Sequence, residues 1–292
     1  MPELPEVETI KNQLFEEILN DRIIDVIFLW DGILKGILVQ DFKKRVLGRR
    51  IIDIKRRAKN LLIFLDSKDT IVVHFKLTGH VLLLEDKFQV NSYGSWEGEN
   101  LPPVLKDSQN QFIRVIFKLA SGRILAISDL RKFAYLKLFN EKDLDDFLRE
   151  YGPEPFDENL TFEEFKKRIQ NKKSPIKKVL MDQKVIAGIG NIYSDEALFE
   201  AKIHPLVLPS DISEEKILIL FKAIKKVLKE ALGRGGTSIS DFRNIKGERG
   251  SFDLVRKVYR REGKPCLVCG ALIQRIKIGG RSAHFCPVCQ KK

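Results

Sequence analysis

The sequence predicts a two-domain α+β protein with a β-rich first half, a helical second half and a metal-binding hairpin at its end. Its 292 residues suffice for two cores at roughly 100 to 200 residues per domain. Apolar spacing changes from strand-like to helical near Tyr151. All four cysteines fall near the end, as two pairs. We expect domains at residues 1–150, 151–240 and 241–292.

Composition narrows the class of protein. Hydrophobic content of 43% and charged content of 32% exclude a collagen-like, low-complexity or disordered chain. No apolar run approaches the roughly 18 to 20 residues of a membrane span, and MPELPEVET is acidic with no apolar signal region. We expect a cytoplasmic protein without a membrane partner.

The first half predicts an antiparallel β-sandwich or barrel packed by one helix. Apolar residues recur at three- and four-residue spacing from about Glu6 to Asn20, which indicates an amphipathic helix. Between Ile23 and Phe139 short β-rich runs follow, with a hairpin turn at Ser121-Gly122. The stretch from Asp86 to Gln111 lacks periodicity and predicts a long surface loop.

Helical patterns dominate after the proline-containing segment YGPEPFDENL, which marks the domain boundary. FEEFKKRIQ, SPIKKVLMDQ and SDEALFEAKI predict helices, the last of them after the glycine-rich turn AGIGN. Ser213 opens a longer helix that GRGG ends, and its apolar face carries Ile217, Phe221, Ile224, Leu228 and Leu232.

Positive charge is concentrated at the end of the chain. The whole protein carries +12, and residues 233–292 hold 14 Lys and Arg against four acids. A polyanion such as nucleic acid is the natural partner, because each neutralised phosphate releases counterions. A solvated basic surface that serves solubility is the alternative.

The cysteine spacing is typical of a closed zinc site. Two residues separate Cys266 from Cys269 and Cys286 from Cys289, with sixteen between the pairs. Four thiolates leave no open coordination position, so the predicted Zn²⁺ is structural. The intervening LIQRIKIGGRSAHF predicts strand, turn and strand, with Arg281 at a rigid tip that could grip phosphate.

Removal of Met1 would make Pro2 a free secondary amine. An α-amino group has a pKa near 8, so an appreciable fraction is an unprotonated nucleophile at neutral pH. Its attack on a sugar C1′ gives a cationic iminium, and the carboxyl of Glu3 beside it can transfer a proton. Chance or helix capping also explains a Pro-Glu start.

Five spaced motifs together resemble the formamidopyrimidine-DNA glycosylase family over essentially the whole chain. They are MPELPEVET, GIGNIY, GGTS followed by SDF, VYRREGKPC, and the cysteine hairpin ending in GGRS. The resemblance implies an N-terminal β-sandwich, a helix-two-turn-helix domain and a zinc finger. It also implies a monomeric base-excision repair enzyme, a glycosylase and AP lyase acting on duplex DNA with an oxidised base or abasic site.

The resemblance also implies roles for individual residues. Pro2 is the nucleophile, Glu3 handles protons, and Lys59 lies near the reacting sugar phosphate. Asn191 and Arg281 grip the phosphate beside the flipped nucleotide, and His74 also contacts DNA. When the damaged nucleotide is flipped out of the duplex, a wedge of three side chains fills the space that it leaves. The wedge consists of Leu77, Arg131 and Phe133.

This chain departs from the family pattern around the wedge. Leu77 stands where methionine is more usual, and Asn60 where an aromatic residue is common. DLRKFA replaces the more familiar DPRRFG, which changes the residues at Leu130, Lys132 and Ala134. These departures concern the residues that determine which base the protein accepts opposite the lesion, the orphan base. The segment FRNIKGERGSF, residues 242–252, corresponds to the loop that closes over the lesion.

The resemblance implies removal of 8-oxoguanine and formamidopyrimidines through a Schiff base on Pro2, followed by β- and δ-elimination. An inactive family member that senses lesions or shapes DNA is one alternative. A zinc-ribbon RNA-binding protein is another; it explains the charge and cysteines but neither the N-terminus nor GIGNIY.

Overall fold

The computed structural model describes residues 2–238 and 242–292. Contacts divide the chain into two compact units. Unit 1 comprises residues 1–149 and 234–253, and unit 2 comprises residues 150–233 and 254–292. Met1 lies outside the described residues, and so do Ser240 and Asp241 of the SDF motif. The expected boundary between the second and third domains falls between these last two residues.

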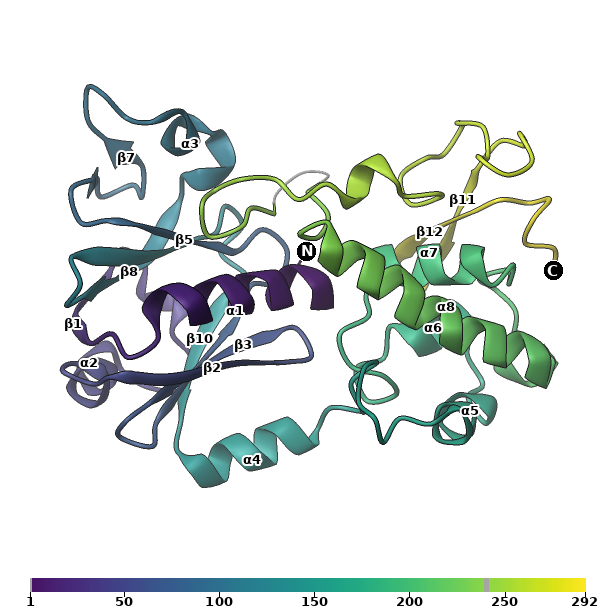
Figure 1. Cartoon of the computed structure of the whole chain (residues 1–292), viewed down its shortest axis with the longest axis horizontal. Coiled ribbons are helices and arrows are strands. Elements are labelled where there is room, and N and C mark those ends of the chain that lie inside the picture. Colours follow the sequence, from purple (N-terminus) through teal and green to yellow (C-terminus); the bar gives the residue numbers. More distant parts are fainter. Residues whose placement is uncertain (1, 239–241) are drawn as a thin grey trace. The chain divides into compact units, whose positions relative to one another are not determined.

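Unit 1 is a β-sandwich of two four-stranded sheets (Figure 1). Of the two folds expected from the sequence, sandwich and barrel, the structure shows the sandwich. One antiparallel sheet has the order β1-β8-β9-β5, with bounds Ile23–Phe28, Ile113–Leu119, Arg123–Ser128 and His80–Glu85. The other has the order β10-β4-β3-β2, with bounds Tyr135–Phe139, Thr70–His74, Asn60–Leu65 and Ile51–Arg57. β8 and β9 form the hairpin expected at Ser121-Gly122.

Helix α1 (Leu4–Ile18) confirms the first expected helix and packs along the strands β2 and β3 (Figure 1). Its fully buried stripe, Val7, Ile10, Leu14 and Ile18, enters one core with residues of both sheets. Each such side chain stabilises the fold by about 1.5–3 kcal/mol. Phe15, which fits the apolar pattern, is 41% exposed instead.

Two short helices of unit 1 follow no pattern recognised in the sequence. They are α2 (Val39–Val46), which buries Phe42 and Val46, and α4 (Glu141–Arg149), which buries Leu144. Each has few apolar positions, so neither produces a sustained period. A single-turn helix, η1, spans Asp31–Ile33.

The stretch from Asp86 to Gln111 is not the surface loop that its aperiodic sequence suggests. It contains β6 (Gln89–Val90), β7 (Trp96–Glu97), α3 (Pro103–Lys106) and η2 (Ser108–Asn110). Trp96 and Leu105 are buried, and they share a second core with residues of the β1-β8-β9-β5 sheet. Long-range contacts rather than a local period order this segment.

Unit 2 is helical and ends in the expected hairpin. Its helices are α5 (Phe162–Gln170), α6 (Ile176–Leu180), α7 (Asn191–Glu200) and α8 (Glu214–Gly233), with single turns η3 (Pro209–Asp211) and η4 (Phe252–Leu254), the latter at the unit boundary. α6 is shorter than expected, and α7 begins three residues earlier, at Asn191. Strands β11 (Gln274–Ile278) and β12 (Arg281–Phe285) pair across Gly279-Gly280. No helix among the described residues is long and apolar enough to cross a membrane.

Candidate functional site

The start of α1 fixes Pro2 and Glu3. Glu3 is the N-cap residue, and both residues are buried. The backbone N–H of Glu3 donates to Glu6 Oε2 over 2.7 Å. Pro5 lies in the first helical turn, where its missing N–H costs no hydrogen bond. The backbone that carries the proposed nucleophile is therefore held by a buried carboxylate.

The same carboxylate joins α1 to the GGTS motif within unit 1. Glu6 is 1% exposed, and its Oε1 accepts the N–H of Thr237 over 2.7 Å. Gly236 has φ +82°, and a Cβ there would lie 2.7 Å from Glu6 Oε1. Only glycine meets both demands, the left-handed backbone and the close approach of the carboxylate.

Lys59 lies in the turn between β2 and β3 and is 6% exposed. Arg56 connects this turn to α1: its Nε donates to Glu8 Oε2 over 2.6 Å, and its Nη1 donates to the Ala58 carbonyl over 2.8 Å. Burial opposes ionisation of Glu8, but the hydrogen bond from Lys11 and the Arg56 charge outweigh it and lower its pKa. The first turns of α1 and the Lys59 turn thus form one connected network.

His74 ends β4, in register with Asn60 on β3 and Tyr135 on β10. Burial, followed by the charges of Lys76 and Lys59, lowers the pKa of His74 to about 3. The ring is therefore neutral at physiological pH. Its Nδ1 accepts the N–H of Lys76 over 3.0 Å. The ring proton is consequently on Nε2, where it can be donated to an anionic oxygen.

Two turns present the expected wedge residues, and buried polar groups hold these turns together. Thr78 hydrogen-bonds to Asp129, and the N–H of Arg131 donates to Thr78 Oγ1 over 3.1 Å. Asp129 Oδ2 also accepts the N–H of Ala134 over 2.7 Å. Leu77, which precedes Thr78, is half-buried.

The other two wedge residues face solvent. Phe133 is 49% exposed, and the Arg131 guanidinium lies 4.8 Å from the centroid of its ring. An exposed aromatic ring next to a cation suits contact with stacked bases and phosphate.

In unit 2, the GIGN turn positions Asn191 as the first residue of α7. Gln183 holds the turn by accepting the N–H of Gly188 over 2.9 Å and donating to the Ile189 carbonyl over 2.7 Å. The Asn191 Oδ1 atom is buried and has no hydrogen-bond partner among the described residues.

A buried charged cluster joins the elements that carry Asn191 and Arg281. Lys177 of α6 donates to Asp195 Oδ1 of α7 over 2.5 Å and to the Ser282 carbonyl of β12 over 2.8 Å. The backbone N–H of His284 donates to Asp195 Oδ2 over 2.9 Å. The side chains of Lys177 and Asp195 are at most 1% exposed. The hairpin strand with the exposed Arg281 is thereby fixed against α7.

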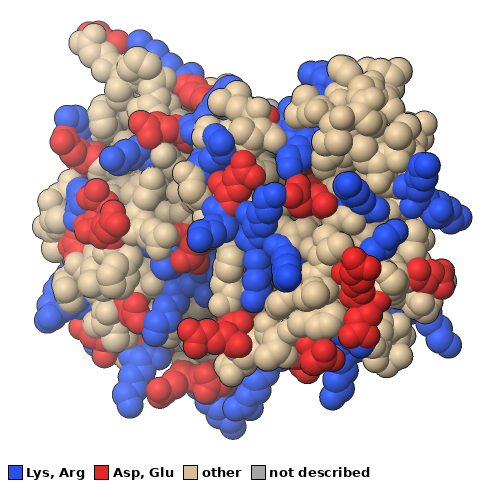
Figure 2. All heavy atoms as spheres, turned by 45° about the vertical axis from the view of Figure 1, so that its right-hand side comes forward, with Lys and Arg blue, Asp and Glu red and all other residues tan. Residues whose placement is uncertain are grey.

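Arg281 also borders a basic cavity of about 350 Å³ within unit 2. Four lysines line it as well, Lys172, Lys173, Lys177 and Lys178, together with the acidic Asp182. The charge of Lys177 is already paired with Asp195, so the other three lysines and Arg281 supply the excess positive charge. Lys and Arg side chains are numerous on the face drawn in Figure 2, with acidic side chains interspersed. The cavity has the charge of an anion-binding surface.

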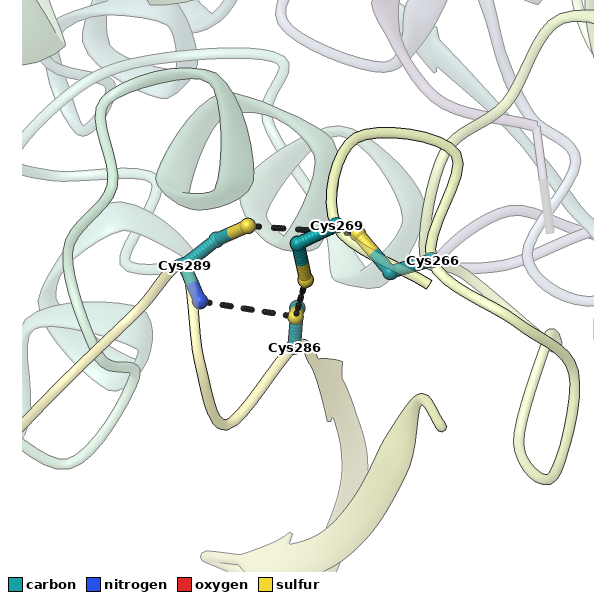
Figure 3. Close-up of side chains that lie close together, drawn as sticks. All are labelled: Cys266, Cys269, Cys286 and Cys289. Carbon is teal, nitrogen blue, oxygen red and sulfur yellow. Dashed lines mark hydrogen bonds between the residues drawn. The ribbon is translucent and has the colours of Figure 1, made fainter. Parts of the chain in front are cut away.

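The sulfurs of the two cysteine pairs, Cys266/Cys269 and Cys286/Cys289, lie close together (Figure 3). All four Sγ atoms lie within 4.8 Å of one another; the Cys266–Cys289 pair is 3.9 Å apart and the Cys269–Cys286 pair 3.4 Å. A tetrahedral zinc with Zn–S bonds of about 2.3 Å requires sulfurs about 3.8 Å apart. Backbone N–H groups of Val268 and Cys289 also donate to sulfur. The donor set and its spacing fit Zn²⁺.

Sequence reasoning missed the residues that support this site. Glu6 was detectable, because Glu3 and Glu6 have the spacing of a capping box. Lys177 and Asp195 gave no such signal, since their partners lie far apart in sequence. Each unit holds its own predicted residues: Pro2, Glu3, Lys59, His74 and the wedge in unit 1, and Asn191, Arg281 and the cysteines in unit 2.

Comparisons with known proteins cover the whole chain. Residues 1–136 match the formamidopyrimidine-DNA glycosylase N-terminal domain, residues 151–243 match the H2TH domain of the same family, and residues 263–292 match the zinc finger found in FPG and IleRS. Formamidopyrimidine-DNA glycosylases of Desulfitobacterium hafniense and Carboxydothermus hydrogenoformans are each 38% identical, covering 99% and 100% of this chain and 100% of each relative.

Solved structures agree with these matches. Lactococcus lactis Fpg in complex with an abasic site containing DNA has a TM-score of 0.86 at 30% identity, over 99% of this chain and 100% of that one. Its complex with a FAPY-dG containing DNA has a TM-score of 0.85 at 30% identity, with the same coverage of both chains.

Proposed function

Because the chain belongs to the formamidopyrimidine-DNA glycosylase family, we propose that it removes oxidised purines from duplex DNA and then cleaves the strand. The substrates are 8-oxoguanine, formamidopyrimidines and abasic sites. The Lactococcus lactis relative has been solved with abasic-site and FAPY-dG DNA, which supports this substrate class. We place the activity in the cytoplasm and in a monomer.

The observation that carries the proposal is the fixed position of Pro2 and Glu3 at the N-terminus of α1. Once Met1 is removed, the Pro2 amine lies at the positive end of the helix dipole, which disfavours its protonated form. The nitrogen lone pair forms a bond to C1′ while the bond from C1′ to the base breaks. Glu3 is the nearby group that transfers protons.

The C1′–O4′ bond of the sugar then breaks: the Pro2 nitrogen loses its proton and shares its lone pair with C1′, while O4′ takes up a proton. The product is a cationic iminium, from which the second stage follows. Its positive nitrogen acidifies the hydrogens on C2′, so a base can remove one and expel the 3′ phosphate by β-elimination. A second elimination then expels the 5′ phosphate and leaves a one-nucleotide gap. Lys59, His74, Asn191 and Arg281 supply hydrogen-bond donors for the phosphates, and Leu77, Arg131 and Phe133 fill the vacated space.

We also propose one structural Zn²⁺, held by Cys266, Cys269, Cys286 and Cys289. Four thiolate ligands would close its coordination shell, so it supplies folding free energy rather than chemistry. The hairpin between the two cysteine pairs fixes Arg281 at the start of β12, where its guanidinium can bind a phosphate.

Borohydride trapping tests the nucleophile. Reduction during reaction with lesion-containing duplex should give a stable protein–DNA adduct with the native N-terminus. A variant that retains Met1, or carries an N-terminal extension, should bind the duplex yet give no adduct and no strand cleavage. Full activity of the blocked protein would refute the role of Pro2, and binding without cleavage by the native protein would favour a non-catalytic lesion binder.

A further inference from the structure

The segment from Asp86 to Gln111 folds against residues 242–247 of the same unit. It has its own apolar anchor, because Trp96 and Leu105 are buried beside the β1-β8-β9-β5 sheet. Its polar side chains then extend to the backbone and side chains of the later segment. Both segments belong to unit 1, although about 130 residues separate them in sequence.

The first contact is an ion pair. Arg243 donates from Nε and Nη2 to Asp107 Oδ2 over 3.0 and 2.8 Å, and its side chain is fully buried. Burial alone would raise the pKa of Asp107, but the Gln109 N–H and the Arg243 guanidinium outweigh it and lower this pKa. Arg243 also donates to the Phe242 carbonyl over 2.8 Å, so the pair holds the backbone as well.

The second contact is the fully buried amide of Asn110. Its Nδ2 donates to the Val104 carbonyl over 2.7 Å and to the Gly247 carbonyl over 3.2 Å, and its Oδ1 faces His80 Nε2 at 3.0 Å. Gly247 has φ +77°, and a Cβ there would lie 2.3 Å from Val104 Cγ2. The fit between the two segments is therefore close enough to require glycine.

The backbone of the later segment is also tied to the sandwich. The N–H of Leu83 donates to the Ile245 carbonyl over 2.8 Å. Phe242 and Ile245 are buried in the main core. Contacts within unit 1 thus hold residues 242–247, at the beginning of the segment 242–252.

We propose that Asp107 and Asn110 are positioning residues that pre-order the segment 242–252 for contact with the damaged base. The inference rests on the proposed function and on the role that the family resemblance implies for this segment, which is to close over the lesion. Order that exists before binding lowers the entropic cost of closing the segment. The effect is confined to base excision, because an abasic site offers no base for the segment to contact.

Two rates measured on each variant test this inference. Asp107→Ala and Asn110→Ala should slow single-turnover excision from a formamidopyrimidine duplex by about tenfold or more, in line with the loss of a charge-assisted or buried hydrogen bond. Strand cleavage at a preformed abasic site should stay within about twofold of the parent rate. Asp107→Glu keeps the carboxylate and should recover most of the excision rate.

Glu99→Ala is the matched control, since it removes an exposed carboxylate from the same segment. It should leave both rates unchanged. Hydrogen exchange of the protein without DNA gives a second measurement, in which the amides of residues 242–247 should exchange faster in Asp107→Ala.

Equal losses of excision and abasic-site cleavage would overturn the inference, because they indicate general destabilisation. Unchanged excision in both alanine variants would overturn it as well. Absence of both activities in the parent protein would instead refute the proposed function, so the two failures are distinguishable.

Discussion

The ammonium of Lys177 lies in the interior of unit 2, where only well-placed partners offset its desolvation. It has the Asp195 carboxylate and the Ser282 carbonyl, and His284 Nδ1 lies 3.2 Å from the same carboxylate. Removing one member of such a pair leaves an uncompensated buried charge. The cluster thus fixes β12 to α6 through Lys177 and to α7 through Asp195.

Lys177→Met should lower the free energy of unfolding by about 3–5 kcal/mol, because it leaves Asp195 charged and buried. Chemical denaturation followed by far-ultraviolet circular dichroism measures this loss. The double variant Lys177→Met/Asp195→Leu removes both charges and should regain much of it.

Lys226→Met is the control for that experiment. Lys226 pairs with Glu200 but its side chain is 63% exposed, so its loss should cost less than about 1 kcal/mol. Comparable losses for Lys177 and Lys226 would contradict the view that burial makes the Lys177 pair decisive.

At the scale of elements, the position of α1 depends on a glycine in a distant segment. Gly235 and Gly236 both have positive φ, +67° and +82°, but they differ in their surroundings. A Cβ on Gly236 would press on the Glu6 carboxylate at 2.7 Å, whereas the nearest atom to a Cβ on Gly235 is 3.9 Å away. The two positions therefore separate backbone strain from displacement of Glu6.

Gly236→Ala should reduce single-turnover cleavage by about tenfold or more, because displaced Glu6 no longer fixes Glu3. Gly235→Ala carries a similar penalty of about 1 kcal/mol for left-handed alanine but should retain most of the activity. Single-turnover cleavage rates of the two variants, measured at saturating protein on the same duplex, test this difference. Equal activities would show that the carboxylate does not transmit the clash to the N-terminus.

Elements with a local signal were predictable from the sequence. The apolar period of α1, the Ser121-Gly122 turn and the paired cysteines each depend on residues close together in the chain. The order of residues 86–111 was not predictable, since Asp107 and Asn110 act on residues near 245. The Lys177–Asp195 pair was not predictable for the same reason. The wedge residues and the residues assigned to DNA phosphates came from the family resemblance and stay predictions.

For the whole molecule, the two units offer separate reporters. Both tryptophans, Trp30 and Trp96, belong to unit 1, while all four cysteines belong to unit 2. Tryptophan fluorescence therefore reports on unit 1 alone, and loss of metal acts on unit 2.

Removal of zinc by a chelator should weaken duplex binding by about tenfold or more, because the hairpin that presents Arg281 loses its fold. The tryptophan emission should not change, and added Zn²⁺ should restore binding. A shift of that emission on chelation would show that the metal also stabilises unit 1, and unchanged binding would remove the hairpin from the DNA contact.

The return of residues 234–253 to unit 1 has a consequence for the order of events during synthesis. Phe242 and Ile245 complete a core whose other members lie within the first 149 residues. The ribosome therefore releases most of the sandwich well before the side chains that close it. Until they emerge, the nascent N-terminal part exposes an apolar gap, which is the kind of surface that chaperones bind.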